Sequence, residues 1–186
     1  MGFISGAYLK FLLKSTNQHG VHSPFVYNLV TKCFYKRKKR KEYVSLKQIY
    51  ISNDKISYRT AKLLYKITSY FLVKKALILQ DSSQMVSQIL SLNNSIAITT
   101  IPNGVYDMIY LDIDALEKSS ILENLFSYMH NDTVLIFNSI YNNATNTTLW
   151  EDIKQHPKVT VTIDVFRLGF VFIRHEQAKE NFSIRT

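Results

Sequence analysis

Polar side chains that could take part in chemistry follow three short apolar runs of this sequence. Gln80, Asp81 and Ser82 come directly after the first run, Thr99 closes the second, and Asp112 closes the third. Carboxylates and hydroxyls at such positions can contact a ligand, or they can cap a following helix by accepting hydrogen bonds from its first backbone N–H groups. For Asp81 and Ser82 the second role is expected.

Several familiar kinds of catalytic site are missing from the sequence. It has no Ser-His-Asp order, no zinc-ligand spacing and no glycine-rich phosphate loop. His19 and His22 are candidates for metal ligands or a base, but no acidic or cysteine residue stands at ligand spacing, which favours bonds to backbone groups. Cys33 lies among apolar residues and is interpreted as a buried side chain rather than a nucleophile. We therefore expect no metal ion and assign no catalytic residue.

The positive charge is concentrated in one stretch of the chain. The net charge is +9, and six positive charges fall in a single run, which leaves +3 for all other residues; the run is Lys36, Arg37, Lys38, Lys39, Arg40 and Lys41. The basic character is therefore expected to be local. Tyr35 and Tyr43 flank the run, so it could bind nucleic acid through phosphates and stacked bases. A solvated loop is the alternative interpretation.

The N-terminal segment and the cysteine content bear on location. One cysteine cannot form an internal disulfide, and no signal peptide is visible. Lys10 and Lys14 interrupt the apolar stretch at the start of the chain, so it is too short to span a bilayer. These features predict a cytoplasmic protein without a membrane segment.

The apolar pattern predicts alternating strands and helices after a helical leader. Apolar residues make up 46% of the 186 residues, enough for the core of one α/β domain. The expected helices cover 4–12, 24–34, 58–72, 82–92, 120–129 and 148–155, and the expected strands cover 76–79, 95–99, 106–112, 133–137, 159–165 and 169–173. Residues 44–58 are ambiguous.

The last two expected strands are separated by only three residues, Phe166, Arg167 and Leu168. This connection is too short for a crossover helix, so the strands must form an antiparallel hairpin. The whole pattern predicts a doubly wound, mostly parallel sheet with one reversed edge element. Residues 1–45 form the helical leader, residues 46–186 form the α/β part, and the two are expected to make one compact unit.

Two stretches resemble a bacterial family of class I S-adenosylmethionine-dependent methyltransferase-like proteins. His19–Tyr27 resembles the N-terminal signature of that family. Trp150–Asp164 resembles its C-terminal segment, which continues in the family as here, with Gly169–Phe172 and the tail Arg174–Gln177. The resemblance implies a Rossmann-like fold that ends in a β-hairpin, and S-adenosylmethionine as the cofactor. By this resemblance Gln80, Asp81, Ser82, Thr99 and Asp112 are the cofactor-binding residues.

The expected donor-binding loops depart from the family pattern. Where the family has an acidic residue and a glycine-rich turn, residues 80–84 contain no glycine. Thr99 stands where a carboxylate usually accepts hydrogen bonds from the ribose. Asp112 and Asp114 match one half of the divalent-cation site of related O-methyltransferases, but Asn138 and Ser139 replace the acidic residues of the other half.

A further departure is a deletion between Thr100 and Tyr106. The family has a helix, a strand and another helix there, and a parallel crossover needs about a dozen residues. Either residues 101–105 double back in extended form beneath the sheet, or Asn103 and Gly104 form a hairpin and the strand pairing changes.

Three hypotheses about function follow. The preferred one is a degenerate, catalytically impaired methyltransferase, a pseudoenzyme that binds or scaffolds a protein partner. The second is an active methyltransferase with a rebuilt donor pocket, in which Asp81, Thr99 and Asp112 contact the donor and a small molecule is the acceptor. The third is a nucleic-acid-associated protein that uses residues 36–43.

Overall fold

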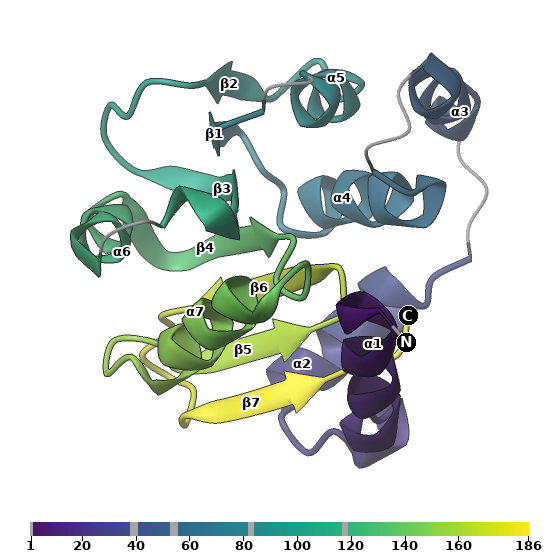
Figure 1. Cartoon of the computed structure of the whole chain (residues 1–186). Coiled ribbons are helices and arrows are strands. Elements are labelled where there is room, and N and C mark those ends of the chain that lie inside the picture. The colour runs from purple at the N-terminus through teal and green to yellow at the C-terminus, as the bar shows by residue number, and fades with distance from the viewer. Residues whose placement is uncertain (1, 38–40, 53–55, 82–83, 117–118) are drawn as a thin grey trace.

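A seven-stranded mixed sheet lies between helices in the computed structural model, which describes residues 2–37, 41–52, 56–81, 84–116 and 119–186 (Figure 1). The strands are β1 Lys75–Leu79, β2 Ala97–Thr99, β3 Tyr106–Asp112, β4 Met129–Asn138, β5 Val161–Asp164, β6 Leu168–Phe172 and β7 Glu180–Ser183. The helices are α1 Phe3–Lys14, α2 Pro24–Leu29, α3 Glu42–Ser52, α4 Tyr58–Tyr70, α5 Met85–Ser91, α6 Ser119–Ser127 and α7 Ala144–Gln155. A π-helical turn, Val30–Phe34, continues α2.

The strand order is β2-β1-β3-β4-β6-β5-β7. Four neighbouring pairs are parallel, and β6 runs antiparallel to both β4 and β5. The predicted mostly parallel α/β fold with a C-terminal hairpin is therefore confirmed. One detail of the prediction is wrong, because the reversed strand β6 lies inside the sheet and not at its edge. The edge is formed by β7, which pairs in parallel with β5 and which the polar sequence of 180–183 did not reveal.

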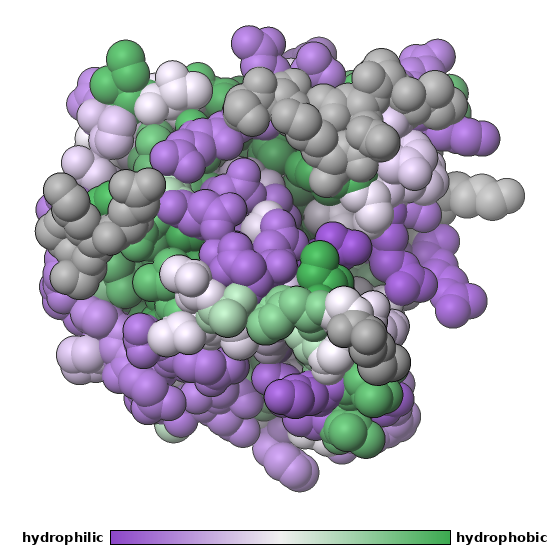
Figure 2. Space-filling model, viewed as in Figure 1, coloured by the Kyte–Doolittle hydropathy of each residue, from purple (hydrophilic) through white to green (hydrophobic). Residues whose placement is uncertain are grey.

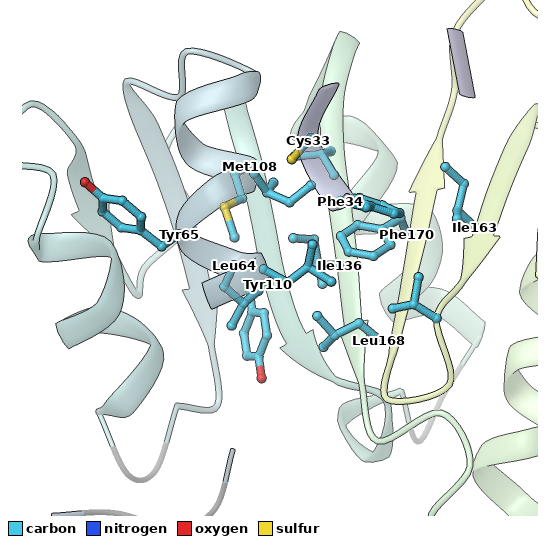
Figure 3. Close-up of a cluster of buried hydrophobic side chains, with 14 of the residues drawn as sticks. Cys33, Phe34, Leu64, Tyr65, Met108, Tyr110, Ile136, Ile163, Leu168 and Phe170 are labelled. Carbon is cyan, nitrogen blue, oxygen red and sulfur yellow. The ribbon is translucent and has the colours of Figure 1, made fainter. Parts of the chain in front are cut away.

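Each face of the sheet carries its own hydrophobic core, because alternate strand residues point to opposite faces. In β1, Ala76 and Ile78 join a first core cluster with α2, α4 and α5, whereas Leu77 joins a second with α1, α6 and α7. Figure 3 shows part of the first cluster, where Cys33 and Phe34 of the leader approach Phe170 of β6. Cys33 is buried, as predicted.

Side-chain caps fix the starts of the leader's second helix and of α4. Ser23 accepts a hydrogen bond from Val26 N and precedes Pro24, while Ser57 accepts one from Thr60 N. These are the positions expected from the sequence. The expected helix 82–92 starts later than predicted, at Met85, because Gln84 has the left-handed backbone conformation. The ambiguous stretch 44–58 contains most of α3.

The short connection from β2 to β3 takes the first of the two routes considered. No hairpin forms, and β1 pairs in parallel with both β2 and β3. Thr99 and Ile109 both lie level with Leu77, so the return to Tyr106 covers about 10 Å along the strands and about 10 Å across them. Seven Cα–Cα steps reach about 23 Å, which is ample. The crossover can be short because β2 has only three residues.

The leader is joined to the sheet at several points. Phe11 of α1 is buried in the second core cluster, and Thr16 forms a β-bridge with Ile184 beside β7. Lys14 Nζ lies 3.0 Å from the Tyr141 hydroxyl, which donates a 2.5 Å hydrogen bond to the fully buried carboxylate of Asp164. The two ends of the chain therefore lie close together (Figure 1). No described helix is long and apolar enough to span a membrane.

Candidate functional site

The carboxyl ends of β1, β3 and β4 meet at one edge of the sheet. We call it the donor edge, because the sequence resemblance predicts that the methyl donor binds there. β1 leads into α5 on one face of the sheet, whereas the neighbouring β3 leads toward α6 on the other. A position where neighbouring strands lead to helices on opposite faces of the sheet is a topological switch point. Open α/β sheets bind their ligands at such points. The donor edge brings Asp81 and Asp112 close enough to influence the same neighbouring phenol, that of Tyr110.

Two glutamines that flank the centre of the loop after β1 have a backbone conformation that favours glycine. Gln80 and Gln84 have φ angles of 57° and 53°, in the left-handed region that favours glycine. The Asp81 carboxylate accepts a 2.8 Å hydrogen bond from Ser87 N, in the first turn of α5. The expectation that Asp81 caps this helix is therefore confirmed, while Ser82 lies outside the described residues.

Asp112 is half-buried and held by the neighbouring strand. Its Oδ1 accepts hydrogen bonds from Asn138 Nδ2 at 2.6 Å and from Ser139 Oγ at 3.2 Å. Burial raises the pKa of the Asp112 carboxyl above its ordinary value; the two hydrogen bonds lower it, and the nearby charges of Asp114 and Asp81 raise it. Ser139 also has a left-handed φ of 65°.

Tyr110 is a member of this site that the sequence reading missed. Its side chain is almost fully buried and belongs to the first core cluster. Burial raises the pKa of the Tyr110 phenol well above its ordinary value, and the charges of Asp112 and Asp81 add to that effect. Its place in the alternating apolar pattern of β3 marks it only as a core residue.

Thr99 is not brought to the donor edge. It lies level with Leu77 of β1, two residues before that strand ends, because β2 stops early. Its hydroxyl donates to Ile101 O at 2.9 Å and accepts from Ile101 N at 3.2 Å, so it stabilises its own turn. Thr99 therefore lies farther back along the sheet than Asp81 and Asp112, and its role as a cofactor-binding residue stays a prediction.

The residues expected to bind S-adenosylmethionine and a divalent cation are poorly suited to hold either group. The Asp81 carboxylate is bonded to its own helix, Thr99 provides no carboxylate, and glutamines occupy the two left-handed positions, 80 and 84, that favour glycine. Asn138 turns its amide N–H group, a donor, toward Asp112. In the described part of the chain no three His, Cys, Asp or Glu side chains gather as metal ligands would.

Two other candidates lie away from the donor edge. The ring of His19 contacts the Gln18 amide at 3.2 Å, not a backbone group as expected, and His22 is exposed. In the basic run, Lys36, Arg37 and Lys41 are exposed, whereas residues 38–40 lie outside the described residues.

Comparison with known proteins gives evidence at the level of the fold. No protein-family model matches the sequence, and no curated protein matches it. The S-adenosylhomocysteine-bound methyltransferase PaMTH1 from Podospora anserina matches with a TM-score of 0.54 and 8% identity, over 82% of this chain and 96% of that one. A Staphylococcus aureus protein assigned as a caffeoyl-CoA O-methyltransferase matches with a TM-score of 0.52 and 12% identity, over 72% and 92%.

A third similar structure is the cofactor-bound Rv0187 from MTB, with a TM-score of 0.51 and 8% identity, over 81% of this chain and 94% of that one. Identities this low establish a shared fold and no shared activity. Together with the strand order and the reversed strand β6, these matches show that the chain has the methyltransferase-like, Rossmann-like α/β fold of the class I S-adenosylmethionine-dependent enzymes.

Proposed function

We propose that this protein keeps the methyltransferase sheet but has lost efficient binding of the methyl donor, and that it acts by binding another molecule. One observation carries this proposal. Three of the described polar side chains expected to contact the donor already make hydrogen bonds within the protein: Asp81 with α5, Thr99 with its own turn, and Asp112 with Asn138 of β4. A donor would have to compete with these internal hydrogen bonds, and each bond broken without replacement costs about 1–3 kcal/mol.

Calorimetric titration with S-adenosylmethionine and S-adenosylhomocysteine tests the proposal. We expect dissociation constants no tighter than about 1 mM, equivalent to about 4 kcal/mol, for both compounds. The protein should first show a cooperative thermal transition, so that weak binding cannot be attributed to unfolding. Micromolar binding, equivalent to about 8 kcal/mol, would contradict the proposal and indicate a rebuilt pocket.

The second candidate is an active methyltransferase of a small-molecule acceptor, and the closeness of Asp81 and Asp112 at the switch point favours it. On this alternative Asp112→Ala abolishes methyl transfer while the fold survives. Asp152→Ala is the control, because Asp152 is an exposed carboxylate on α7 that belongs to neither the expected donor set nor the expected cation site. Activity lost in the first variant and kept in the second would support the alternative over the proposal above.

A further inference from the structure

Three adjoining cavities lie along one side of the molecule, and the first begins beside the donor edge, where Ser139 N donates a hydrogen bond to Arg167 O. The first, about 290 Å³, lies between α1, the start of α4 and the β5–β6 turn. Three arginines line it: Arg59 of α4, Arg167 of the turn, and Arg185 near the end of the chain. All three are exposed.

The other two cavities extend the same basic lining. The second, about 270 Å³, shares Arg59 with the first and adds Arg37, Lys62 and Lys66. The third, about 280 Å³, shares Lys66 with the second and adds Lys32 and Lys36. We call the three together the basic groove. Because consecutive cavities share a lining residue, they lie next to one another from the β5–β6 turn to α3.

The charge of the basic groove is of one sign. Among the described residues, no Asp or Glu side chain lines any of the three cavities. Of its eight cations only Lys36 and Arg37 belong to the basic run, so folding gathers six others that are scattered in the sequence. Figure 2 shows hydrophilic side chains collected on the right of the view, between the positions of α4 and α1. The basic character is therefore broader than the sequence suggested.

Partly exposed aromatic rings line the same cavities. Tyr8 lines the first cavity, beside a Phe166 ring that is stacked on Tyr141, while Tyr35 lines the second cavity and Tyr43 the third. The Tyr8 side chain is 46% exposed. Aromatic rings provide flat surfaces on which bases stack, at about 1–3 kcal/mol per base.

We propose that the basic groove binds single-stranded nucleic acid. A single strand carries a phosphate at every nucleotide, so it matches cations spread along a path, and its bases match the rings that line the same cavities. A small anion would fill only one of the three cavities, and it would not account for the positive charge that lines the other two. A flat anionic membrane would be matched by cations on a flat or convex surface, whereas these cations line cavities. The proposal rests on other side chains than those expected to contact the donor, so it stands whether or not the donor binds.

Fluorescence anisotropy with a labelled 20-nucleotide single-stranded RNA of mixed sequence tests the proposal with the full chain. The double variant Arg59→Gln/Arg185→Gln removes two groove cations outside the basic run. We expect at least tenfold weaker binding at 100 mM salt. The plot of log affinity against log salt should become shallower by about 1.4, since each phosphate contact to a single strand contributes about 0.7.

The control is Lys74→Gln/Lys179→Gln, which changes the net charge equally at exposed positions outside the groove. It should bind RNA within about twofold of the unchanged protein. Equal binding by both double variants would overturn the proposal, because the charge of the basic run would then account for the binding. Binding to polyglutamate or to vesicles with 30% phosphatidylserine as tight as to RNA would also overturn it, since charge alone would explain the affinity.

Discussion

Three non-glycine residues with left-handed backbone, Gln80, Gln84 and Ser139, lie at the donor edge. Such a conformation costs a residue with a Cβ atom about 1–2 kcal/mol. Gln84→Gly should therefore stabilise the fold by about 0.5–1 kcal/mol, measured by urea unfolding. The matched control is Gln88→Gly, at an exposed position inside α5, which should destabilise it by about 1 kcal/mol. A loss of stability in both variants would mean that Gln84 does not have the left-handed backbone conformation.

Asp107 fixes the amino ends of β1 and β3. Its Oδ2 accepts hydrogen bonds from Lys74 N and Lys75 N, both at 2.8 Å, and its Oδ1 lies 3.2 Å from His130 Nε2. Burial tends to raise the pKa of the Asp107 carboxyl, but the two backbone hydrogen bonds and His130 outweigh burial and lower it. The carboxylate therefore stabilises the fold above its unfolded pKa, and that stabilisation is lost as pH falls through the lower folded pKa.

Asp107→Asn should accordingly destabilise the protein by about 1 kcal/mol at pH 7. The difference from the unchanged protein should begin to shrink below about pH 4, where Asp107 of the unfolded chain takes up its proton, and should reach its minimum below the lowered folded pKa. Urea unfolding at several pH values checks this, with the exposed Asp152→Asn on α7 as the control. A difference that is constant from pH 7 to pH 3 would contradict a role for the charge.

At this scale the sequence predicted contacts within one turn better than contacts between strands. The capping role of Asp81 was predicted because its partner, Ser87, is only six residues away. The hydrogen bond from Asn138 to Asp112 depends on the register of β3 and β4, which the residue types alone do not determine. The position of Thr99 depends on how early β2 ends, and strand ends are poorly encoded in short apolar runs.

The contact between β6 and α7 depends on a glycine. A Cβ atom at Gly169 would lie 2.6 Å from ring carbons of the fully buried Trp150. Gly169→Ala should therefore force the strand and helix apart and cost about 1–3 kcal/mol in unfolding free energy. Gly6→Ala in α1 is the matched control, because nothing lies within 4 Å of its Cβ position, and it should stabilise the helix by about 0.5–1 kcal/mol. A Gly169→Ala protein as stable as the control would refute this packing.

Elements with strong apolar patterns were predicted, and elements that depend on neighbours were not. The apolar residues of β1, β3 and β4 identified buried parallel strands, and the three-residue turn required the β5–β6 hairpin. β7 was missed because only one of its four residues, Phe182, is buried. The strand β7 exists because β5 offers it an unpaired edge, and that edge is a property of the sheet.

The whole molecule brings together charges that the sequence separates. Net charge and the run at 36–41 were visible from composition, but the basic groove also needs Arg167 from a hairpin and Arg185 from near the end of the chain. These residues meet only because the leader and β7 place both ends of the chain beside α4 (Figure 1). Composition therefore gave the amount of charge and not its distribution.

The prediction that leader and α/β part form one unit can be tested with the single tryptophan. Leu29 of α2 is fully buried in the first core cluster, whereas Trp150 of α7 lies in the second, on the opposite face of the sheet. Strands β1, β3 and β4 contribute residues to both clusters, so losing the packing on one face should unfold the other with it.

Leu29→Ala should therefore lower the urea midpoint reported by Trp150 fluorescence by an amount equivalent to about 2–5 kcal/mol. Leu13→Ala is the control, because Leu13 is on the leader helix α1 and its side chain is 82% exposed, so the midpoint should stay within about 0.5 kcal/mol. If Leu29→Ala instead left the Trp150 transition unchanged while the leader lost its protection from hydrogen exchange, the leader would be a separate folding unit. The basic groove, which draws residues from the leader and from the α/β part, would then form only when the two are docked.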